Sequence, residues 1–219
     1  PTTFCAGDSV TLTSSGASGN NWSNGATTQA INVLNSGSFT VYVVELGCTS
    51  AVSLPTVVTS NPIPPTPTIT ASGPTTFCAG DSVVLNSSAG SGNVWSNGAT
   101  SISTTIFASG TYSVFEVALG CTSATSTPIV VTVNPIPAAP IITPLGPTAF
   151  CTGDSVVLSS NYPAGNTWST GANTQAITVN TAGIFTAFVV ELGCTSAVSL
   201  PVSITVNPTP PTPTVTASG

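Results

Sequence analysis

The chain carries few side chains that could do acid–base, nucleophilic or ligand chemistry. It has no Lys, Arg or His, so it lacks the usual general base, the usual Schiff-base amine and the usual anion clamp. What remains is six carboxylates and six cysteines. The carboxylates are Asp8, Glu45, Asp81, Glu116, Asp154 and Glu191, and the cysteines are Cys5, Cys48, Cys78, Cys121, Cys151 and Cys194.

These groups are too sparse for the common kinds of active site. No two carboxylates are close in sequence, so a hydrolase with paired carboxylates would need the fold to bring an Asp and a Glu together. A zinc site is disfavoured because there is no CxxC pair and no His. A tight calcium site is disfavoured because no Asp-rich run supplies enough oxygen ligands. We therefore expect a non-catalytic protein without metal or cofactor.

The cysteines and tryptophans recur with a period of 73 residues. "FCAGDSVTL" at Phe4 returns as "FCAGDSVVL" at Phe77 and "FCTGDSVVL" at Phe150. Such periodicity is typical of a tandem array. It defines repeat 1 (residues 1–62, without a first strand), repeat 2 (63–135), repeat 3 (136–208) and a first strand of a following repeat (209–219).

The last segment has two interpretations. The chain is a window cut from a longer array, or the segment is donated as a strand to another molecule.

Composition limits the fold class and the partners. The net charge is -6 without any cation, so binding to nucleic acid is close to excluded, and no apolar run is long enough for membrane insertion. No signal peptide is evident in the segment. Because 41% of the residues are apolar and Val, Thr, Gly and Pro abound, the chain is expected to be a folded all-β protein.

Repeat 2 illustrates the expected elements. Alternating patterns predict strands separated by Gly-Asp, Asn-Gly and Gly-Cys turns, with Asn97-Gly98 read as a hairpin signal. The predicted strands are 68–71, 75–78, 82–86, 93–96, 101–107, 111–119 and 129–133. This number of short strands in 73 residues favours a two-sheet sandwich, so the fold class is all-β, a tandem array of three Ig-like domains.

The order Cys, Trp, Cys is that of immunoglobulin domains, but the cysteines lie elsewhere in the strand pattern. We predict one bond within each repeat, which joins its first strand to the turn before its last: Cys5–Cys48, Cys78–Cys121 and Cys151–Cys194. Each would stabilise by roughly 4 kcal/mol for loops of about 44 residues. Disulfides also indicate an oxidising compartment.

Two aromatic positions are informative. Trp22, Trp95 and Trp168 each lie within a predicted strand and are expected in the core. The long strand is apolar on both faces, with Tyr42, Phe115 and Phe188 on the side away from the core. We expect a neighbouring domain or chain to cover these three side chains, which would then be packing contacts. The alternative is a bulge that switches the two faces within the long strand.

The pattern "FCAGDSVTL…NWSNGATTQAI…SGSFTV…GCTSAVS…P" resembles the Ig-like tandem repeats of very large Bacteroidota surface adhesins, including gliding-motility adhesins. The resemblance covers the whole chain. It implies export by the type IX system and an adhesive or filamentous role at the extracellular cell surface. Tyr42, Phe115 and Phe188 depart from it, because such repeats often carry a small polar residue there.

The resemblance also suggests a modification. Asp8, Asp81 and Asp154 begin an Asp-Ser-Val motif similar to Bacteroidota O-glycosylation sites, with Ser9, Ser82 and Ser155 as acceptors. A structural role is compatible with it, since Gly-Asp makes a turn in which Asp can cap backbone N–H groups.

The predicted function is a structural repeat segment of an extracellular fibre or stalk-like adhesin. Its partners would be adjacent repeats, other copies in a fibre, and surface glycans. The joints "NPIPPTPT", "NPIPAAPI" and "NPTPPTPT" should be stiff and extended. One alternative is a carbohydrate- or ligand-binding module, which only the loop aromatic Tyr162 supports. The other is a set of spacer domains of a secreted enzyme.

Overall fold

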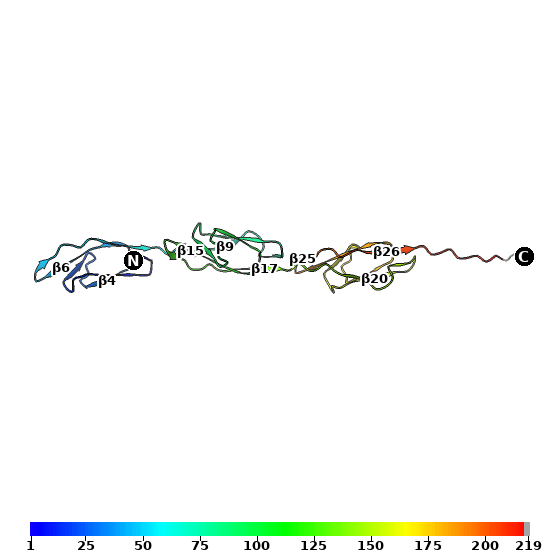
Figure 1. Cartoon of the computed structure of the whole chain (residues 1–219), viewed down its shortest axis with the longest axis horizontal. Helices are drawn as coiled ribbons and strands as arrows, with labels where there is room; N and C mark the ends of the chain where they lie inside the picture. Colours follow the sequence, from blue (N-terminus) through cyan, green and yellow to red (C-terminus); the bar gives the residue numbers. More distant parts are fainter. Residues whose placement is uncertain (217–219) are drawn as a thin grey trace. The chain divides into compact units, whose positions relative to one another are not determined.

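The computed structural model describes residues 1–216, and all regular elements in this range are β-strands (Figure 1). None of the described residues forms a helix that could cross a membrane. The chain divides into two compact units that interleave in sequence. Unit 1 holds Pro1–Gly73, Val83–Ile106 and Gly110–Val131, and unit 2 holds Pro74–Ser82, Phe107–Ser109 and the chain from Thr132 onward.

The same strands recur in each repeat, except that repeat 1 has no counterpart of the first strand of repeats 2 and 3. Those of repeat 1 are β1 Thr3–Cys5, β2 Val10–Thr13, β3 Asn20–Trp22, β4 Ala30–Val33, β5 Gly37–Phe39, β6 Val41–Glu45, β7 Cys48–Thr49 and β8 Thr56–Asn61. Those of repeat 2 are β9 Ile69–Ala71, β10 Thr76–Cys78, β11 Val83–Ser87, β12 Asn93–Trp95, β13 Ser103–Ile106, β14 Gly110–Tyr112, β15 Val114–Ala118, β16 Cys121–Thr122 and β17 Ile129–Asn134. Those of repeat 3 are β18 Ile142–Pro144, β19 Ala149–Cys151, β20 Val156–Ser160, β21 Asn166–Trp168, β22 Ala176–Val179, β23 Gly183–Phe185, β24 Ala187–Glu191, β25 Cys194–Thr195 and β26 Val202–Asn207.

Repeat 3 lies wholly in unit 2 and shows the sandwich that the strand pattern predicts. One sheet has the order β18-β20-β22, and the opposing strands are β19-β26-β23 and β21-β24-β25. β19 runs parallel to β26, whereas the other pairs are antiparallel. The buried side chains between these layers form one core: Val156, Leu158, Trp168, Val179, Phe185, Ala187 and Ile204.

The three tryptophans lie in the core, as predicted. Trp95 and Trp168 are 2% exposed and Trp22 is 7% exposed. Each indole N–H donates to a backbone carbonyl six residues on, as Trp168 Nε1 does to Thr174 O at 2.8 Å. The polar edge of the ring is therefore satisfied inside its own repeat, and the Trp serves packing.

The predicted long strand is in fact two strands. In repeat 2, β14 pairs with β17, and β15 pairs with β12 and β16, so the chain changes partners at Ser113. The faces do not switch, since Phe185, Ala187 and Val189 of repeat 3 alternate along the chain and are all buried. The alternative of a face-switching bulge is therefore wrong.

Asn97-Gly98 is confirmed as a tight turn, but it does not make a hairpin of the two strands that flank it. Gly98 N–H donates to Trp95 O in a tight turn, but the flanking strands β12 and β13 belong to different sheets. The two-residue hairpin of the repeat is Leu119-Gly120, which joins β15 to β16. Both residues have positive φ, 52° and 81°, which is the geometry of a tight hairpin turn but is uncommon for Leu.

Candidate functional site: the junctions between repeats

The disulfides join different repeats. Cys5 bonds to Cys121 and Cys78 bonds to Cys194, each pair 116 residues apart in sequence with 5.6 Å between the Cα atoms. Each bond therefore joins the first cysteine of one repeat to the second cysteine of the next, and each lies within one compact unit. The predicted pairs Cys5–Cys48, Cys78–Cys121 and Cys151–Cys194 are wrong. Cys48 and Cys151 are exposed and have free thiols.

Strand direction explains why a repeat cannot close on itself. In repeat 1, β1 runs parallel to β8 and places Cys5 beside Asn61, the last residue of β8. β5 runs antiparallel and ends with Phe39 beside Thr56, the first residue of β8. β6 follows β5 and extends beyond the start of β8, so the β6–β7 hairpin with Cys48 lies at that end of the repeat. The two cysteines of one repeat consequently lie at opposite ends of it.

An asparagine strengthens each junction. Asn61 Nδ2 donates to Leu119 O at 2.9 Å, and Asn134 Nδ2 donates to Leu192 O at 2.9 Å. The accepting carbonyl belongs in each case to the Leu of the Leu-Gly hairpin, with positive φ. The unusual Leu conformation thus presents a backbone acceptor to the last residue of the preceding repeat's final strand.

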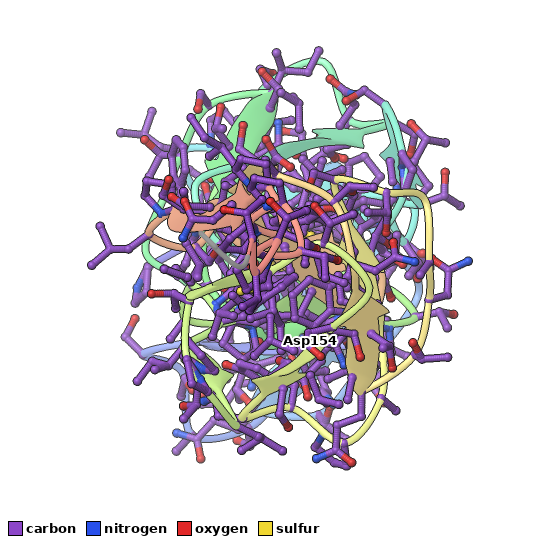
Figure 2. All side chains as sticks on the ribbon, turned by 90° about the vertical axis from the view of Figure 1, so that its right-hand side faces the viewer. Asp154 is labelled. Atoms are coloured by element: carbon purple, nitrogen blue, oxygen red, sulfur yellow. A yellow bond between two sulfur atoms is a disulfide. The ribbon has the colours of Figure 1, made fainter. Side chains whose placement is uncertain are left out.

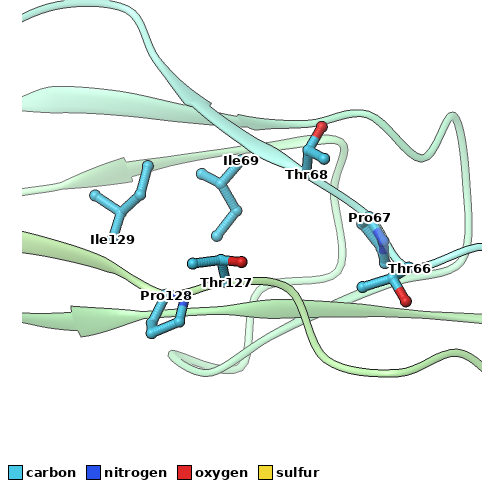
Figure 3. Close-up of a pocket in the computed structure, with 7 residues that line it drawn as sticks. All are labelled: Thr66, Pro67, Thr68, Ile69, Thr127, Pro128 and Ile129. Carbon is cyan, nitrogen blue, oxygen red and sulfur yellow. The ribbon is translucent and has the colours of Figure 1, made fainter.

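The proline-rich joint then runs along the next repeat rather than standing free. It starts at the Asn61–Leu119 bond, and it ends where Thr66–Ile69 lie opposite Thr127–Ile129 across a hollow of about 330 Å³ (Figure 3). Pro64 and Pro67 of this joint are buried. Repeat 3 has an equivalent hollow of about 470 Å³, lined by Ala139–Ile142 and by Val198, Leu200, Pro201 and Val202.

After the joint, a short strand enters the sandwich of the next repeat. β9 pairs antiparallel with β11, with Leu85 beside Ala71, and β18 pairs with β20 in the same register. Thr68 N–H also donates to Ser88 Oγ at 2.9 Å. A junction therefore has four parts: a disulfide, an Asn–Leu hydrogen bond, a packed joint and an added strand.

The residues under the joint differ in burial between repeats. Cys121 and Cys194 are 1% and 0% exposed, whereas Cys48 is exposed. Two serines in each repeat differ in burial in the same way as the cysteine. Ser123, Ser126, Ser196 and Ser199 are buried, but Ser50 and Ser53 are exposed. In each repeat these hydroxyls accept from strand N–H groups, as Ser126 Oγ does from Val114 N at 3.1 Å.

The Gly-Asp motif is a turn beside the first cysteine. Asp8 N–H donates to Cys5 O at 2.9 Å, and Gly7 has a φ of 99°, which favours glycine. Asp81 and Asp154 donate in the same way. The predicted turn is confirmed. The predicted capping is not seen, since within residues 1–216 no backbone N–H donates to these carboxylates. Asp154, labelled in Figure 2, is exposed.

Of the remaining candidate residues, Tyr162 contacts the proline-rich joint, and the others make none of the bonds that define a junction. Ser9, Ser82 and Ser155 are exposed beside the Gly-Asp turn, and their glycosylation stays a prediction. Tyr42 is 36% exposed, and Phe115 and Phe188 are half-buried, so these outer faces are partly open. Tyr162 donates its hydroxyl to Ala138 O of the joint at 3.1 Å. Over residues 1–216, no three Asp, Glu or Cys side chains gather into a group that could hold a metal ion.

The last segment, 209–216, is exposed and forms no strand as far as Thr216; the rest of that prediction, 217–219, lies outside the described residues. The disulfides indicate that the protein matures in an oxidising environment.

Comparisons with known proteins give no family. No family model matches this sequence, and no curated protein matches it. Among solved structures, the chain is similar to one described as the mouse coronavirus receptor-binding domain complexed with its murine receptor. That match has a TM-score of 0.40 and 14% identity, and it covers 64% of this chain and 100% of the other.

Proposed function

We propose that this chain is a non-catalytic structural segment of an extracellular, surface-attached fibre or stalk of the kind found in type IX-exported Bacteroidota adhesins. The observation that carries the proposal is the pairing of the disulfides between successive repeats. A disulfide inside one repeat would also stabilise that repeat, but it would leave the joint to the next repeat without a covalent bypass. A disulfide between repeats supplies this bypass. It benefits a chain that must transmit tension, because the force is then carried by the disulfide and not by the weaker non-covalent contacts at the joint.

The mechanism follows from the order of the bonds. Tension that enters at Cys5 crosses to Cys121 through sulfur, and tension at Cys78 crosses to Cys194. Both bonds span the proline-rich joint between the repeats they connect. Unfolding a repeat under load can therefore release only part of its length, and the joint stays short.

Pulling a single chain by its two ends tests whether the two disulfides carry the tension. The shortest covalent path between Cys5 and Cys194 contains only the segment 78–121, so the oxidised chain should reach about a third of the extension of the reduced chain, at roughly 3.5 Å per residue. Equal extension before and after reduction would contradict the proposed role of the bonds.

Imaging of source cells tests the fibre itself. Antibodies raised against residues 1–216 should label filaments outside the cell in electron micrographs, and preincubation with the purified segment should abolish the label. Label confined to the cell interior, or to secreted material without filaments, would refute the proposal.

A further inference from the structure

We propose that Asn24 is a site of spontaneous deamidation and that the fold protects its counterpart, Asn97, from the same reaction through Thr104. The product is aspartate or isoaspartate at position 24. The inference goes beyond the proposed structural role and does not depend on it, because it rests on a turn inside each repeat and not on the junctions.

Both asparagines lie in the same local sequence. The stretch WSNGAT runs from Trp22 to Thr27 and returns unchanged from Trp95 to Thr100. An Asn followed by Gly readily closes to a succinimide, because Gly has no side chain to hinder the approach of its backbone nitrogen to the Asn side chain. The sequence therefore makes the two sites equally reactive, and a difference between them must come from the fold.

The backbone of the turn is the same in repeats 1 and 2. In each turn the glycine N–H donates to the tryptophan carbonyl at 2.9 Å, and the glycine has a φ of 86°. The asparagine Oδ1 accepts from the N–H two residues on, at 3.1 Å in repeat 1 and 3.2 Å in repeat 2. These bonds are Gly25 to Trp22 and Ala26 to Asn24 in repeat 1, and Gly98 to Trp95 and Ala99 to Asn97 in repeat 2. Both turns must break these same bonds before the asparagine can react.

The two side-chain amides differ in one further hydrogen bond. Asn97 Nδ2 donates to Thr104 Oγ1 at 3.0 Å, and Thr104 is 9% exposed. At the position of Thr104, repeat 1 has Ile31, whose side chain offers no acceptor. No hydrogen bond from Asn24 Nδ2 occurs within residues 1–216. The Asn24 amide is thus held at its oxygen alone, whereas the Asn97 amide is held at both its oxygen and its nitrogen.

Thr104 is a polar residue at a position that is apolar in the other repeats. Its counterparts are Ile31 and Ile177, and Ile31 is 5% exposed and packs in the core of repeat 1. Burying a hydroxyl is unfavourable unless it has a hydrogen-bond partner. The bond to Asn97 offsets this cost, so the same bond makes the threonine tolerable and holds the asparagine in place.

The Asn24 side chain also has space in which to rotate. It is exposed and borders a hollow of about 240 Å³ beside the β4–β5 loop. The reaction needs this rotation, because Cγ must turn away from Ala26 N–H and come within reach of the Gly25 nitrogen. Asn97 must in addition break its bond to Thr104, which should slow its reaction about fivefold.

The reaction consumes water and releases ammonia. The Gly25 nitrogen attacks Cγ of Asn24, the Cγ–Nδ2 bond breaks, and ammonia leaves with the proton from the Gly25 nitrogen. Water then opens the resulting succinimide ring. Attack at Cγ gives aspartate, and attack at the main-chain carbonyl carbon gives isoaspartate, with an extra methylene group in the backbone. Either product adds one negative charge, and neither requires an oxidant or an enzyme.

The turn that would change closes around the core tryptophan. Trp22 N–H donates to Ala26 O at 2.9 Å, and the indole Nε1 donates to Thr28 O at 2.8 Å. An isoaspartate lengthens the chain inside the loop that these bonds close, so it should loosen them. Repeat 1 should therefore age first, because repeat 2 is protected and repeat 3 has Thr170 in place of the asparagine.

Ageing of the purified chain tests the difference without any substitution. The folded protein, and the same protein unfolded in urea with a reductant, are kept at neutral pH and sampled over time. Samples are digested with chymotrypsin, because the chain has no Lys or Arg for trypsin to cleave. Mass spectrometry then follows the gain of one dalton at each asparagine.

In the folded chain, Asn24 should lose its amide about fivefold faster than Asn97. In the unfolded chain the two rates should be equal, because the local sequences are identical. Equal rates in the folded chain would overturn the inference. Unequal rates in the unfolded chain would also overturn it, because the cause would then lie outside the fold.

Two variants test whether Thr104 is the protecting residue. Thr104→Val replaces the hydroxyl by a methyl group and should raise the Asn97 rate about fivefold in the folded chain. Thr105→Val, at the exposed neighbouring position, is the matched control and should leave that rate unchanged. Trp fluorescence shows that each variant is folded. An unchanged Asn97 rate in folded Thr104→Val would contradict the proposed protection.

Discussion

Repeats 1 and 2 have almost the same hairpin, yet they bury it differently. "ELGCTSAVS" in repeat 1 and "ALGCTSATS" in repeat 2 fold into the same strand pair with the same Leu-Gly turn. In repeat 2 the cysteine and the two serines are buried beneath a joint, and in repeat 1 they are exposed. The internal fold of a repeat is therefore set by its own sequence, and its surface environment by the repeat before it.

This comparison separates two kinds of interaction. Bonds inside a repeat should matter equally in repeats 1 and 2. Bonds that belong to the junction should matter in repeat 2 alone, so paired substitutions at equivalent positions can measure the junction directly.

The largest effect should come from the disulfide. Replacing Cys5 and Cys121 together by Ser should lower the free energy of unfolding of unit 1 by about 5 kcal/mol, because the bond closes a loop of roughly 116 residues. The control pair Cys48→Ser and Cys151→Ser should leave stability unchanged. Urea unfolding followed by Trp fluorescence measures both, and equal losses would contradict the bonding pattern.

The next effect should be the same in both repeats. Gly19 and Gly92 have a φ of 69°, and a Cβ on either would collide with the backbone carbonyl oxygen of Val44 or Val117. Gly19→Ala and Gly92→Ala should each cost about 2–4 kcal/mol. Gly90→Ala has open space and no positive φ, so it should be nearly neutral. A large difference between the first two in thermal unfolding would show that the internal frames differ.

A buried serine should then distinguish the repeats. Ser126→Ala removes the acceptor of the buried Val114 N–H and should cost about 1–3 kcal/mol. In repeat 1, Ser53 accepts from Val41 N at 3.1 Å but is exposed, so water can replace its hydroxyl and Ser53→Ala should cost less than half as much. Denaturant midpoints of the two variants give the comparison. Equal costs would mean that the joint does not exclude water.

The smallest effect should come from the junction asparagine. Asn61→Ala removes the hydrogen bond to Leu119 O and should cost about 1 kcal/mol. Asn207→Ala is its equivalent at an exposed position without such a partner in the described chain, so the stability of a single copy should not change. Hydrogen exchange at the Leu119-Gly120 hairpin should rise in the first variant only.

The fold was predictable because it depends on local patterns. Alternating apolar residues around Val83 and Leu85, and a Trp within a short strand, specify a sandwich with a buried indole. The period of 73 residues located the repeats, and Gly-Asp located a turn. The Asn97-Gly98 hairpin prediction failed because that turn connects strands of different sheets, which spacing alone does not reveal.

The junction was not predictable in the same way. Equal spacing makes each cysteine equally compatible with a partner in its own repeat or in the next. Only strand direction shows that Cys5 and Cys48 lie at opposite ends of repeat 1. The Asn that ends each last strand was visible in "NPIP" and "NPTP", but in the two junctions its partner is a backbone carbonyl, which has no sequence signature.

The offset of the disulfides also makes the covalent structure redundant. Residues 5–121 and 78–194 form two overlapping closed loops, so each peptide bond from Cys5 to Cys194 lies inside at least one of them. A protease that cuts once anywhere in this range leaves the two fragments joined through sulfur. Bonds closed within single repeats would leave each proline-rich joint as a point where one cut severs the chain. The way the cysteines pair therefore gives the chain resistance to single cuts by proteases.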